Sequence, residues 1–412
     1  MSVHQDAKQI IDAALRAALP DTAVKKALEK LPPCRGRLIL VAVGKAAWQM
    51  ASAAYEELRD WIDGGTVITK YHHSMGSIGN LTIYEAGHPV PDENSCAATD
   101  AAINMVENLG EEDTVLFLVS GGGSALFEKP LIPLHELADI TAELLSSGAD
   151  IVEINTIRKR LSAVKGGKFA ALCAPAQVFA VLLSDIVGDP LDMIASGPAY
   201  PDSATTEDAL RIAEKYGLRL SDEARALLRV ETPKRLDNVQ THVTGSVRQL
   251  CAAAEVTAES LGYQVTVLTS ELCCEAREAG SFLASIARHH AETEKSLAFI
   301  AGGETVVHLT GNGLGGRNQE LALSAAKGIS GLCDTLLFSV GSDGTDGPTD
   351  AAGGLVDGET LSRLTEAGCD IEAMLRNNDA YHALQAADGL IFTGPTGTNV
   401  NDLSVLLIRR EK

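Results

Sequence analysis

RLILVAVGK (residues 37–45) and TVLFLVSGGGS (residues 114–124) decide the fold, because both follow one pattern. In each stretch, a run of apolar and β-branched residues is followed directly by a glycine-containing loop and then by a helical pattern. A continuous apolar run of this length predicts a strand that is buried on both faces. Such strands, alternating with amphipathic helices, predict an α/β fold with mostly parallel sheets.

The same rhythm recurs along the chain. Further strands are predicted at residues 66–69, 177–183, 241–244, 264–268, 297–301, 335–340 and 405–409. The segment at 230–238 is polar and contains a proline, and it separates the strands into two groups. We therefore predict two domains, one over residues 1–235 and one over residues 236–412.

Composition and charge exclude several classes of protein. The 412 residues include 34 Lys and Arg against 55 Asp and Glu, a formal net charge of −21, which leaves no positive surplus for nucleic-acid phosphates. The 45% hydrophobic content excludes intrinsic disorder, and eight scattered cysteines indicate neither a disulfide scaffold nor a metal site. No apolar run approaches a membrane span and no signal peptide is visible. We expect a cytoplasmic protein without membrane or nucleic-acid partners.

Glycine-containing segments follow the predicted strands. In open α/β sheets, ligands bind beyond the carboxyl ends of the strands, and glycine lets the backbone approach a ligand closely. These segments are Gly44-Lys45, Ser120–Ser124, Ser184–Pro190, Gly302–Glu304 and Gly341–Gly347. The sequence therefore predicts a ligand site built from them.

Charged side chains in and near these segments match the needs of phosphoryl transfer. Acidic members, which could hold Mg²⁺ or accept a proton, are Asp185, Asp189, Glu304, Asp343 and Asp346. Basic members, which could neutralise phosphate or carboxylate, are Lys45, Arg158, Lys159, Lys165 and Arg317. Anion-binding loops, carboxylates and isolated cations together are what phosphoryl transfer requires.

Common nucleotide and hydrolase motifs are absent. There is no GxxxxGK[ST], and the first strand is followed by GKAAWQM rather than by GxGxxG. The serines of SGGGS do not fit a GxSxG elbow, and the loop alone is equally compatible with a tight turn. GHPVPD (residues 87–92) predicts a proline-fixed turn from which His88 could reach the ligand site.

Eight segments, taken in order, resemble the glycerate 2-kinases of the MOFRL family. They are VAVGKAAWQMA (41–51), GHPVPDENS (87–95), LVSGGGSALFEKP (118–130), INTIRKRLSAVKGGKFA (154–170), LLSDIVGDPLDMIASGPAYPD (182–202), AGGETVVHLTGNGLGGRNQELAL (301–323), SVGSDGTDGPTDAAGG (339–354) and TGPTGTNVNDL (393–403). Several long matches in one order are more specific than any single loop, and they cover nearly the whole chain.

The resemblance implies a fold and an activity. The fold has a larger N-terminal, Rossmann-like domain with a mostly parallel, doubly wound sheet, a smaller C-terminal α/β (MOFRL) domain and a cleft between them. The activity is transfer of the γ-phosphoryl group of ATP to the 2-hydroxyl of D-glycerate, with Mg²⁺. The family's catalytic lysine and arginine correspond to Lys45 in VGKA and Arg317 in GGRNQE. Domain closure would bring these two side chains together.

From the loops and the resemblance together, we predict the site residues. Catalysis is assigned to Lys45, Arg317 and Asp189, and metal binding to Asp185 and Asp343. Contacts with ATP are assigned to Ser120, Gly121, Gly122, Gly123, Ser124, Asn155, Arg158, Lys165, Gly302 and Glu304. The roles of Asp185 and Asp189 are interchangeable at this stage, since the sequence supplies no distances.

Two other functions compete with the kinase. Related sequences carry the label hydroxypyruvate reductase, which would require a nicotinamide site; the fingerprint for such a site is missing. A two-lobed protein that binds a small anion without turnover is the third hypothesis. We expect a homodimer only because homodimers are the commonest oligomers of soluble proteins.

Overall fold

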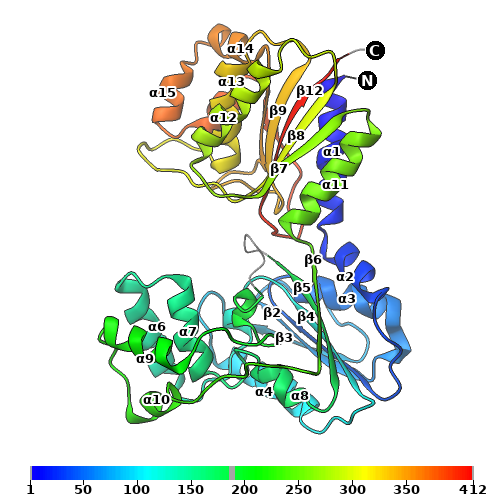
Figure 1. Cartoon of the computed structure of the whole chain (residues 1–412), viewed down its shortest axis with the longest axis vertical. Helices are drawn as coiled ribbons and strands as arrows, with labels where there is room; N and C mark the ends of the chain where they lie inside the picture. Colours follow the sequence, from blue (N-terminus) through cyan, green and yellow to red (C-terminus); the bar gives the residue numbers. More distant parts are fainter. Residues whose placement is uncertain (1, 185–190, 411–412) are drawn as a thin grey trace. The chain divides into compact units, whose positions relative to one another are not determined.

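The structure, a computed structural model, describes residues 2–184 and 191–410. It falls into two compact units, each with its own sheet (Figure 1). Of the described residues, the N-terminal unit holds 20–184 and 191–244, and the C-terminal unit holds 2–19 and 245–410.

The N-terminal unit is built on a six-stranded parallel sheet in the order β3-β2-β1-β4-β5-β6. The strands are β1 (Leu38–Val43), β2 (Gly64–Lys70), β3 (Leu81–Ala86), β4 (Thr114–Val119), β5 (Gln177–Leu183) and β6 (Val239–Thr244). Every residue of β1 is buried, as its apolar run predicts. The chain winds outward in one direction from β1 and in the other from β4, so the strand order reverses between these two strands.

Helices of this unit cover the sheet and build a second small core. They are α2 (Pro20–Leu28), α3 (Ala47–Leu58), α4 (Glu93–Val106), α5 (Gly123–Leu126), α6 (Leu134–Ser146), α7 (Ile151–Leu161), α8 (Lys168–Cys173), α9 (Thr206–Lys215) and α10 (Asp222–Leu227), with single 3₁₀ turns at Arg59–Trp61 and Ile194–Ser196. The second core is formed by α6, α7, α9 and α10, whose apolar residues make one cluster around Leu144 and Ile157. Figure 1 shows this group beside the sheet rather than across it.

The C-terminal unit contains a mixed sheet in the order β11-β10-β9-β12-β8-β7. Its strands are β7 (Gln264–Leu272), β8 (Leu297–Gly303), β9 (Thr335–Gly341), β10 (Gly353–Asp357), β11 (Leu390–Ile391) and β12 (Asp402–Ile408). β7 and β8 are parallel, but every other neighbouring pair is antiparallel. The prediction of a mostly parallel sheet is therefore wrong here. A strand covered on both faces has the same apolar pattern whichever way it runs, so the pattern did not reveal its direction.

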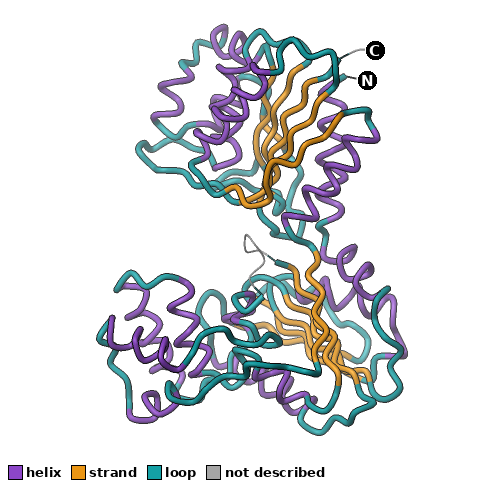
Figure 2. The backbone as a smooth tube through the Cα atoms, viewed as in Figure 1, coloured by secondary structure: helices purple, strands orange, loops and turns teal. Residues whose placement is uncertain are grey.

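Helices lie on both faces of this second sheet (Figure 2). They are α1 (Val3–Ala17), α11 (Val247–Ser260), α12 (Ala276–His289), α13 (Arg317–Ile329), α14 (Thr360–Glu366), α15 (Ile371–Arg376) and α16 (Ala380–Ala386). α1 and α11 pack together on one face, while α12 and α13 pack together on the other. In the described part of the chain, no helix combines the length and hydrophobicity needed to cross a membrane.

We expected the domain boundary between residues 235 and 236, and the two structural units differ from this expectation at two places. Residues 241–244, expected to open the second domain, lie in β6, which pairs with β5 as the last strand of the first sheet. The first 19 residues group with the C-terminal unit, since α1 buries its apolar face against α11. Sequence order did not reveal either pairing, because both depend on contacts between distant residues.

A buried carboxylate attaches α1 to the C-terminal unit. Asp6 is fully buried and accepts a hydrogen bond from the Tyr263 hydroxyl at 2.7 Å. The same carboxylate oxygen pairs with the Arg409 guanidinium, just beyond β12. One side chain of the first helix therefore meets partners from two distant segments of the unit.

Asp6→Ala should lower the free energy of unfolding by about 2–3 kcal/mol, because it leaves buried donors without an acceptor. Asp12→Ala, an exposed position on the same helix, is the matched control and should stay within about 0.5 kcal/mol of the parent protein. Denaturant unfolding followed by circular dichroism measures both. Equal unfolding midpoints for the two variants would contradict this attachment of α1.

Candidate active site

The carboxyl ends of β1 and β4 interlock at the point where the strand order reverses. Gly44 follows β1 with φ +118°, and a Cβ at this position would lie 2.3 Å from the Ser120 hydroxyl oxygen. That hydroxyl accepts a hydrogen bond from the Ala46 N–H at 3.0 Å. Glycine is required at position 44 by both the backbone conformation and this close approach. The two strand-end loops are thereby held against each other.

Hydrogen bonds hold the backbone of Lys45 in place, whereas its side chain is exposed. Its N–H donates to the Gly121 carbonyl at 2.8 Å, and its carbonyl accepts from the Thr69 hydroxyl at 3.3 Å. The side chain is exposed and forms no ion pair within the described residues. An unpaired ammonium beside a glycine loop is available to an anion.

The glycine loop itself offers backbone donors to a ligand. Gly121 and Gly122 are partly exposed, and their N–H groups meet no acceptor among the described residues. Gly122 has φ +85°, which turns the backbone into α5. Successive free N–H groups in such a turn form a concave site for an anion. The N–H groups of Gly121 and Gly122 are therefore available to an anion, whereas the buried Gly123 N–H donates to the Ser120 carbonyl at 3.4 Å; the predicted phosphate contact at Gly121–Gly123 stays a prediction.

Behind the loop, Ser124 and Asn155 join a buried hydrogen-bond chain. The Ser124 and Ser196 hydroxyl oxygens are 2.9 Å apart, and the Ser196 hydroxyl donates to the Asn155 side-chain oxygen at 2.9 Å. Ala195 and Ser196 both have positive φ, and a Cβ on Gly123 would lie 2.6 Å from the Ala195 Cβ. Asn155 is buried, so it supports the loop from behind rather than from its exposed side.

Two basic residues also lie under the loop. Lys165, which we expected to contact phosphate, is fully buried; its ammonium donates to the carbonyls of Ser124 and Phe127 at 2.8 and 2.9 Å. Arg158 donates to the same Ser124 carbonyl at 2.8 Å, and both cations lie within 3.5 Å of the Glu128 carboxylate. These contacts use the Lys165 donors, so this residue positions the loop.

Burial, together with the charge of Arg158, lowers the pKa of Lys165 to about 8, although Glu128 opposes the shift. At pH 7 the ammonium therefore remains largely protonated. Two cations against one carboxylate leave a net positive charge directly beneath the glycine loop. In a buried environment, such a charge favours an anion on the exposed side of the loop.

Lys70 and His73 lie near His88 together with Lys45 and add to the positive charge of this region. Burial lowers the pKa of His88, and the charges of Lys45, Lys70 and His73 lower it further. Lys70 is the last residue of β2 and was not among the predicted site residues. Its position could have been inferred by treating the end of β2 as another strand-end loop.

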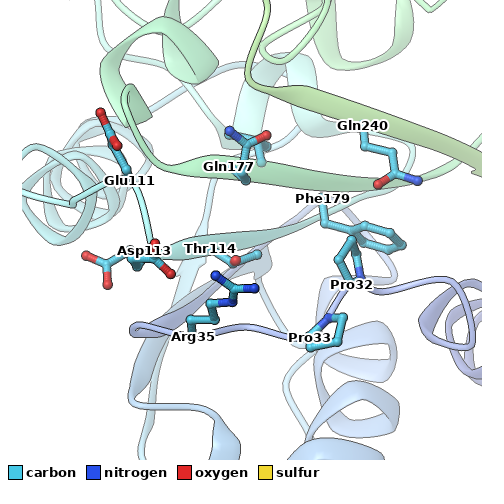
Figure 3. A pocket seen from close by; sticks show the side chains of 11 residues that line it. Pro32, Pro33, Arg35, Glu111, Asp113, Thr114, Gln177, Phe179 and Gln240 are labelled. Carbon is cyan, nitrogen blue, oxygen red and sulfur yellow. The ribbon is translucent and has the colours of Figure 1, made fainter.

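A separate cavity of about 270 Å³ opens at the opposite, amino-terminal edge of the same sheet (Figure 3). Thr114, Gln177 and Gln240, which lie at the starts of neighbouring strands, line it together with Phe179 and Arg35. Ligands of open α/β sheets bind at the carboxyl edge, where the free glycine N–H groups and Lys45 lie. We therefore place the candidate site at the carboxyl edge and not in this cavity.

In the C-terminal unit, Arg317 is the first residue of α13 and is held by two carboxylates. Its Nε and Nη2 donate to the two oxygens of Asp402 at 2.5 and 3.0 Å, and its Nη1 donates to Glu304 at 2.9 Å. Burial raises the pKa of the Asp402 carboxyl, and Arg317 works against that rise. A two-point contact of this kind orients the guanidinium plane.

The start of α13 is capped by a distant loop. Asp346 is buried and accepts from the N–H groups of Asn318 and Gln319 at 3.1 and 2.8 Å. A Cβ on Gly316 would lie 2.3 Å from the Asp346 carboxyl carbon, so glycine is required there. Burial raises the pKa of Asp346 to about 6, although these N–H groups oppose the rise. The cap ties Arg317 to the loop that follows β9.

The other predicted residues of this unit have different surroundings. Gly302 is a buried β8 residue, and a Cβ there would lie 2.6 Å from the Cys251 sulfur; close packing therefore explains this glycine. Asp343 is partly buried after β9 and accepts from the Thr345 N–H at 3.0 Å. No cluster of three or more metal-ligating side chains occurs in the described part of the chain. Asp185 and Asp189 lie outside the described residues.

The structure thus forms two groups of candidate residues. In the N-terminal unit it brings Lys45 to the Ser120–Ser124 loop, with Asn155, Arg158 and Lys165 behind that loop. In the C-terminal unit it brings Glu304 and the unpredicted Asp402 to Arg317. The cleft between the units and the joint action of Lys45 and Arg317 remain predictions.

Known proteins resemble this chain along its full length. Residues 6–229 match a domain described as of unknown function (DUF4147), and residues 297–402 match the MOFRL family. D-glycerate 2-kinase of Thermotoga maritima is 54% identical over 413 residues, which cover 99% of each chain. The chain belongs to the glycerate 2-kinase family.

Other comparisons agree on the fold, although two relatives from Agrobacterium vitis have a different name. A crystal structure of glycerate kinase from Thermotoga maritima matches with a TM-score of 0.95 at 54% identity, covering 98% of this chain and 99% of the other. An Agrobacterium vitis protein with the provisional name hydroxypyruvate reductase is 39% identical, covering 99% of this chain and 95% of its own length. Glycerate kinases are phosphotransferases with an alcohol group as acceptor.

Gly122→Ala tests the loop geometry. The new Cβ would lie 3.2 Å from Lys45 Cγ and 3.0 Å from the His88 ring, so both side chains must shift. We expect turnover in a glycerate kinase assay to fall about 10- to 100-fold, the scale of a small displacement at a reacting centre.

The matched control is Gly148→Ala. Gly148 has φ +75° but nothing within 4 Å of its Cβ position. An alanine there therefore has the same unfavourable backbone conformation as in Gly122→Ala but contacts no neighbouring side chain. It should retain parental turnover and unfold at the same temperature as Gly122→Ala. Equal activity in the two variants would show that Gly122 is not part of the active site.

Proposed function

We propose that this glycerate kinase family member transfers the terminal phosphoryl group of ATP to the 2-hydroxyl of D-glycerate, forming 2-phospho-D-glycerate and ADP. The observation that carries the proposal is the exposed Lys45 ammonium beside the free N–H groups of Gly121 and Gly122. Identity of 54% with a D-glycerate 2-kinase supports the choice of acceptor and position.

The N-terminal site binds the triphosphate. The glycine N–H groups hold phosphate oxygens, and Lys45 stabilises the charge that develops on the transferring group. Arg158 and Lys165 act from beneath by keeping the loop in place and by adding positive charge. Because little covalent chemistry falls to the protein in this reaction, positioning and charge stabilisation supply most of the rate.

Arg317 serves as the second cation. Asp402 holds its Nε and Nη2, whereas its contact with Glu304 involves only Nη1. A substrate carboxylate or phosphoryl oxygen can replace Glu304 at Nη1 while Asp402 keeps the guanidinium plane unchanged. The side chain is about 32% exposed, so Nη1 can be reached from solvent.

A divalent cation fits the described residues in one place. Asp343 is partly exposed and one of its oxygens accepts from Thr345, which leaves the other oxygen for a metal. Mg²⁺ in phosphoryl transfer binds through one or two carboxylates together with substrate phosphates, so a cluster of three protein ligands is not required. Bound there, Mg²⁺ would neutralise phosphate charge. Asp185, the other residue predicted to bind the metal, and Asp189, the predicted catalytic carboxylate, lie outside the described residues.

The reductase remains the second candidate because of two observations. Two relatives carry that name, and the strand order of the N-terminal sheet is the order found in dinucleotide-binding folds. Against it, β1 is followed by Gly44-Lys45 and not by the glycine fingerprint that approaches a pyrophosphate. We therefore favour the kinase.

Phosphorus NMR of the product is the decisive assay. With ATP, Mg²⁺ and D-glycerate, we expect 2-phosphoglycerate, and Lys45→Ala should lower the rate by about 10³-fold because a transition-state charge loses its cation. Lys26→Ala, at an exposed position on α2, is the matched control and should be unaffected. Formation of 3-phosphoglycerate would refute the proposed position. NADH oxidation with hydroxypyruvate and no phosphorylation would favour the reductase.

Asp402→Asn tests how Arg317 is positioned. The substitution keeps the size of the side chain but removes the charge that fixes the guanidinium, so we expect kcat to fall about 10²-fold while the protein remains folded. Steady-state kinetics and circular dichroism check this result. Glu366→Gln, at an exposed position on α14, is the matched control. An unchanged kcat for Asp402→Asn would show that Arg317 needs no such support.

A further inference from the structure

His88 lies at the N-terminal site without a role assigned so far. A Cβ built on Gly122 would be 3.2 Å from His88 Nε2 and 3.2 Å from Lys45 Cγ. The imidazole and the lysine side chain therefore flank the same glycine of the phosphate loop. Within the described residues, neither ring nitrogen of His88 has a hydrogen-bond partner. A partly buried imidazole without a partner, next to an anion site, is available to a substrate.

Burial and the charged groups around His88 favour the neutral form of its ring. Burial lowers its pKa from the usual 6.5, and Lys45, Lys70 and His73 lower it further. Asp92, on the turn that follows, is already bound by the Tyr71 hydroxyl at 2.6 Å and by the Ser95 N–H at 2.8 Å. At neutral pH the imidazole thus keeps a free lone pair, which a proton acceptor requires.

The other histidines near the loop are placed differently. The His73 ring nitrogen Nδ1 lies 3.2 Å from the Lys45 carbonyl, so one side of that ring is already engaged with the backbone. His72 is exposed and has positive φ in the turn after β2. Of the three, His88 is the one that borders Gly122.

We propose that His88 Nε2 accepts the proton of the substrate hydroxyl during phosphoryl transfer, an inference that rests on the proposed kinase function. The hydroxyl oxygen forms a bond to the terminal phosphorus of ATP, and the bond from that phosphorus to the bridging oxygen of ADP breaks. The hydroxyl proton passes to Nε2, and the imidazolium later returns it to solvent. Lys45, on the other side of Gly122, stabilises the negative charge on the phosphoryl oxygens.

This arrangement explains why a neutral base and a cation stand together. A protonated His88 would add positive charge for the phosphates but would have no lone pair for the hydroxyl. Burial and the neighbouring cations oppose its protonation, so the charges that attract the triphosphate also help to keep the base in its active form. A general base whose neutral form dominates at the working pH contributes typically about 10²–10⁴-fold to the rate.

The test compares pH profiles of kcat/KM from pH 5 to 9 for the parent protein, His88→Gln and His88→Asn. The parent rate should fall on the acid side with an apparent pKa below 6.5. Both variants should lose about 10²–10⁴-fold in kcat, keep the KM for ATP within a few-fold, and lack the acid limb. His135→Gln, at an exposed position on α6, is the matched control with the parent profile.

A second measurement separates proton transfer from structural support. In His88→Ala, added imidazole should restore part of the rate in proportion to its concentration, which a purely structural role would not permit. Near-parental kcat in His88→Gln, or an acid limb that persists unchanged, would overturn the assignment of His88 alone. A parent protein that forms no phosphoglycerate would overturn the kinase proposal as well.

Discussion

The contact between Gly44 and Ser120 is the constraint on which the N-terminal site depends. Because position 44 has no Cβ, the end of β1 can approach the end of β4 closely enough for the Ser120 hydroxyl to accept from the Ala46 N–H. That approach places Lys45 within backbone hydrogen-bond distance of Gly121. A cation and a row of free N–H groups then share one edge of the sheet. The fold supplies this arrangement before any ligand binds, so little of the binding energy is needed to order the site.

In the C-terminal unit, two carboxylates hold the candidate cation and its helix in place. Asp402 fixes the guanidinium of Arg317, and Asp346 fixes the start of the helix that carries it. The two cations therefore differ in kind: Lys45 has a free side chain on a fixed backbone, whereas Arg317 has a side chain that is itself fixed. A flexible ammonium can follow a group that moves during the reaction, while a fixed guanidinium suits a group that must be held.

Local patterns predicted the strands and the loops that follow them, because an apolar run and the glycines after it can be seen within a few residues of sequence. They failed where the answer depends on distant pairing. The direction of β12, the place of β6 and the contact between Asp402 and Arg317 all join segments far apart in sequence. Lys165 shows a second limit. Its position in a basic segment indicated charge, but only the structure shows that this charge lies under the loop and donates to the carbonyls of Ser124 and Phe127.

A crystal structure with a non-hydrolysable ATP analogue tests the central claim most directly. If the junction of the β1 and β4 loops is the phosphate site, the terminal phosphate will accept hydrogen bonds from the Gly121 or Gly122 N–H and contact the Lys45 ammonium. If the triphosphate lies elsewhere, for example in the cavity at the amino-terminal edge that Thr114 and Gln177 line, the account of the site is contradicted.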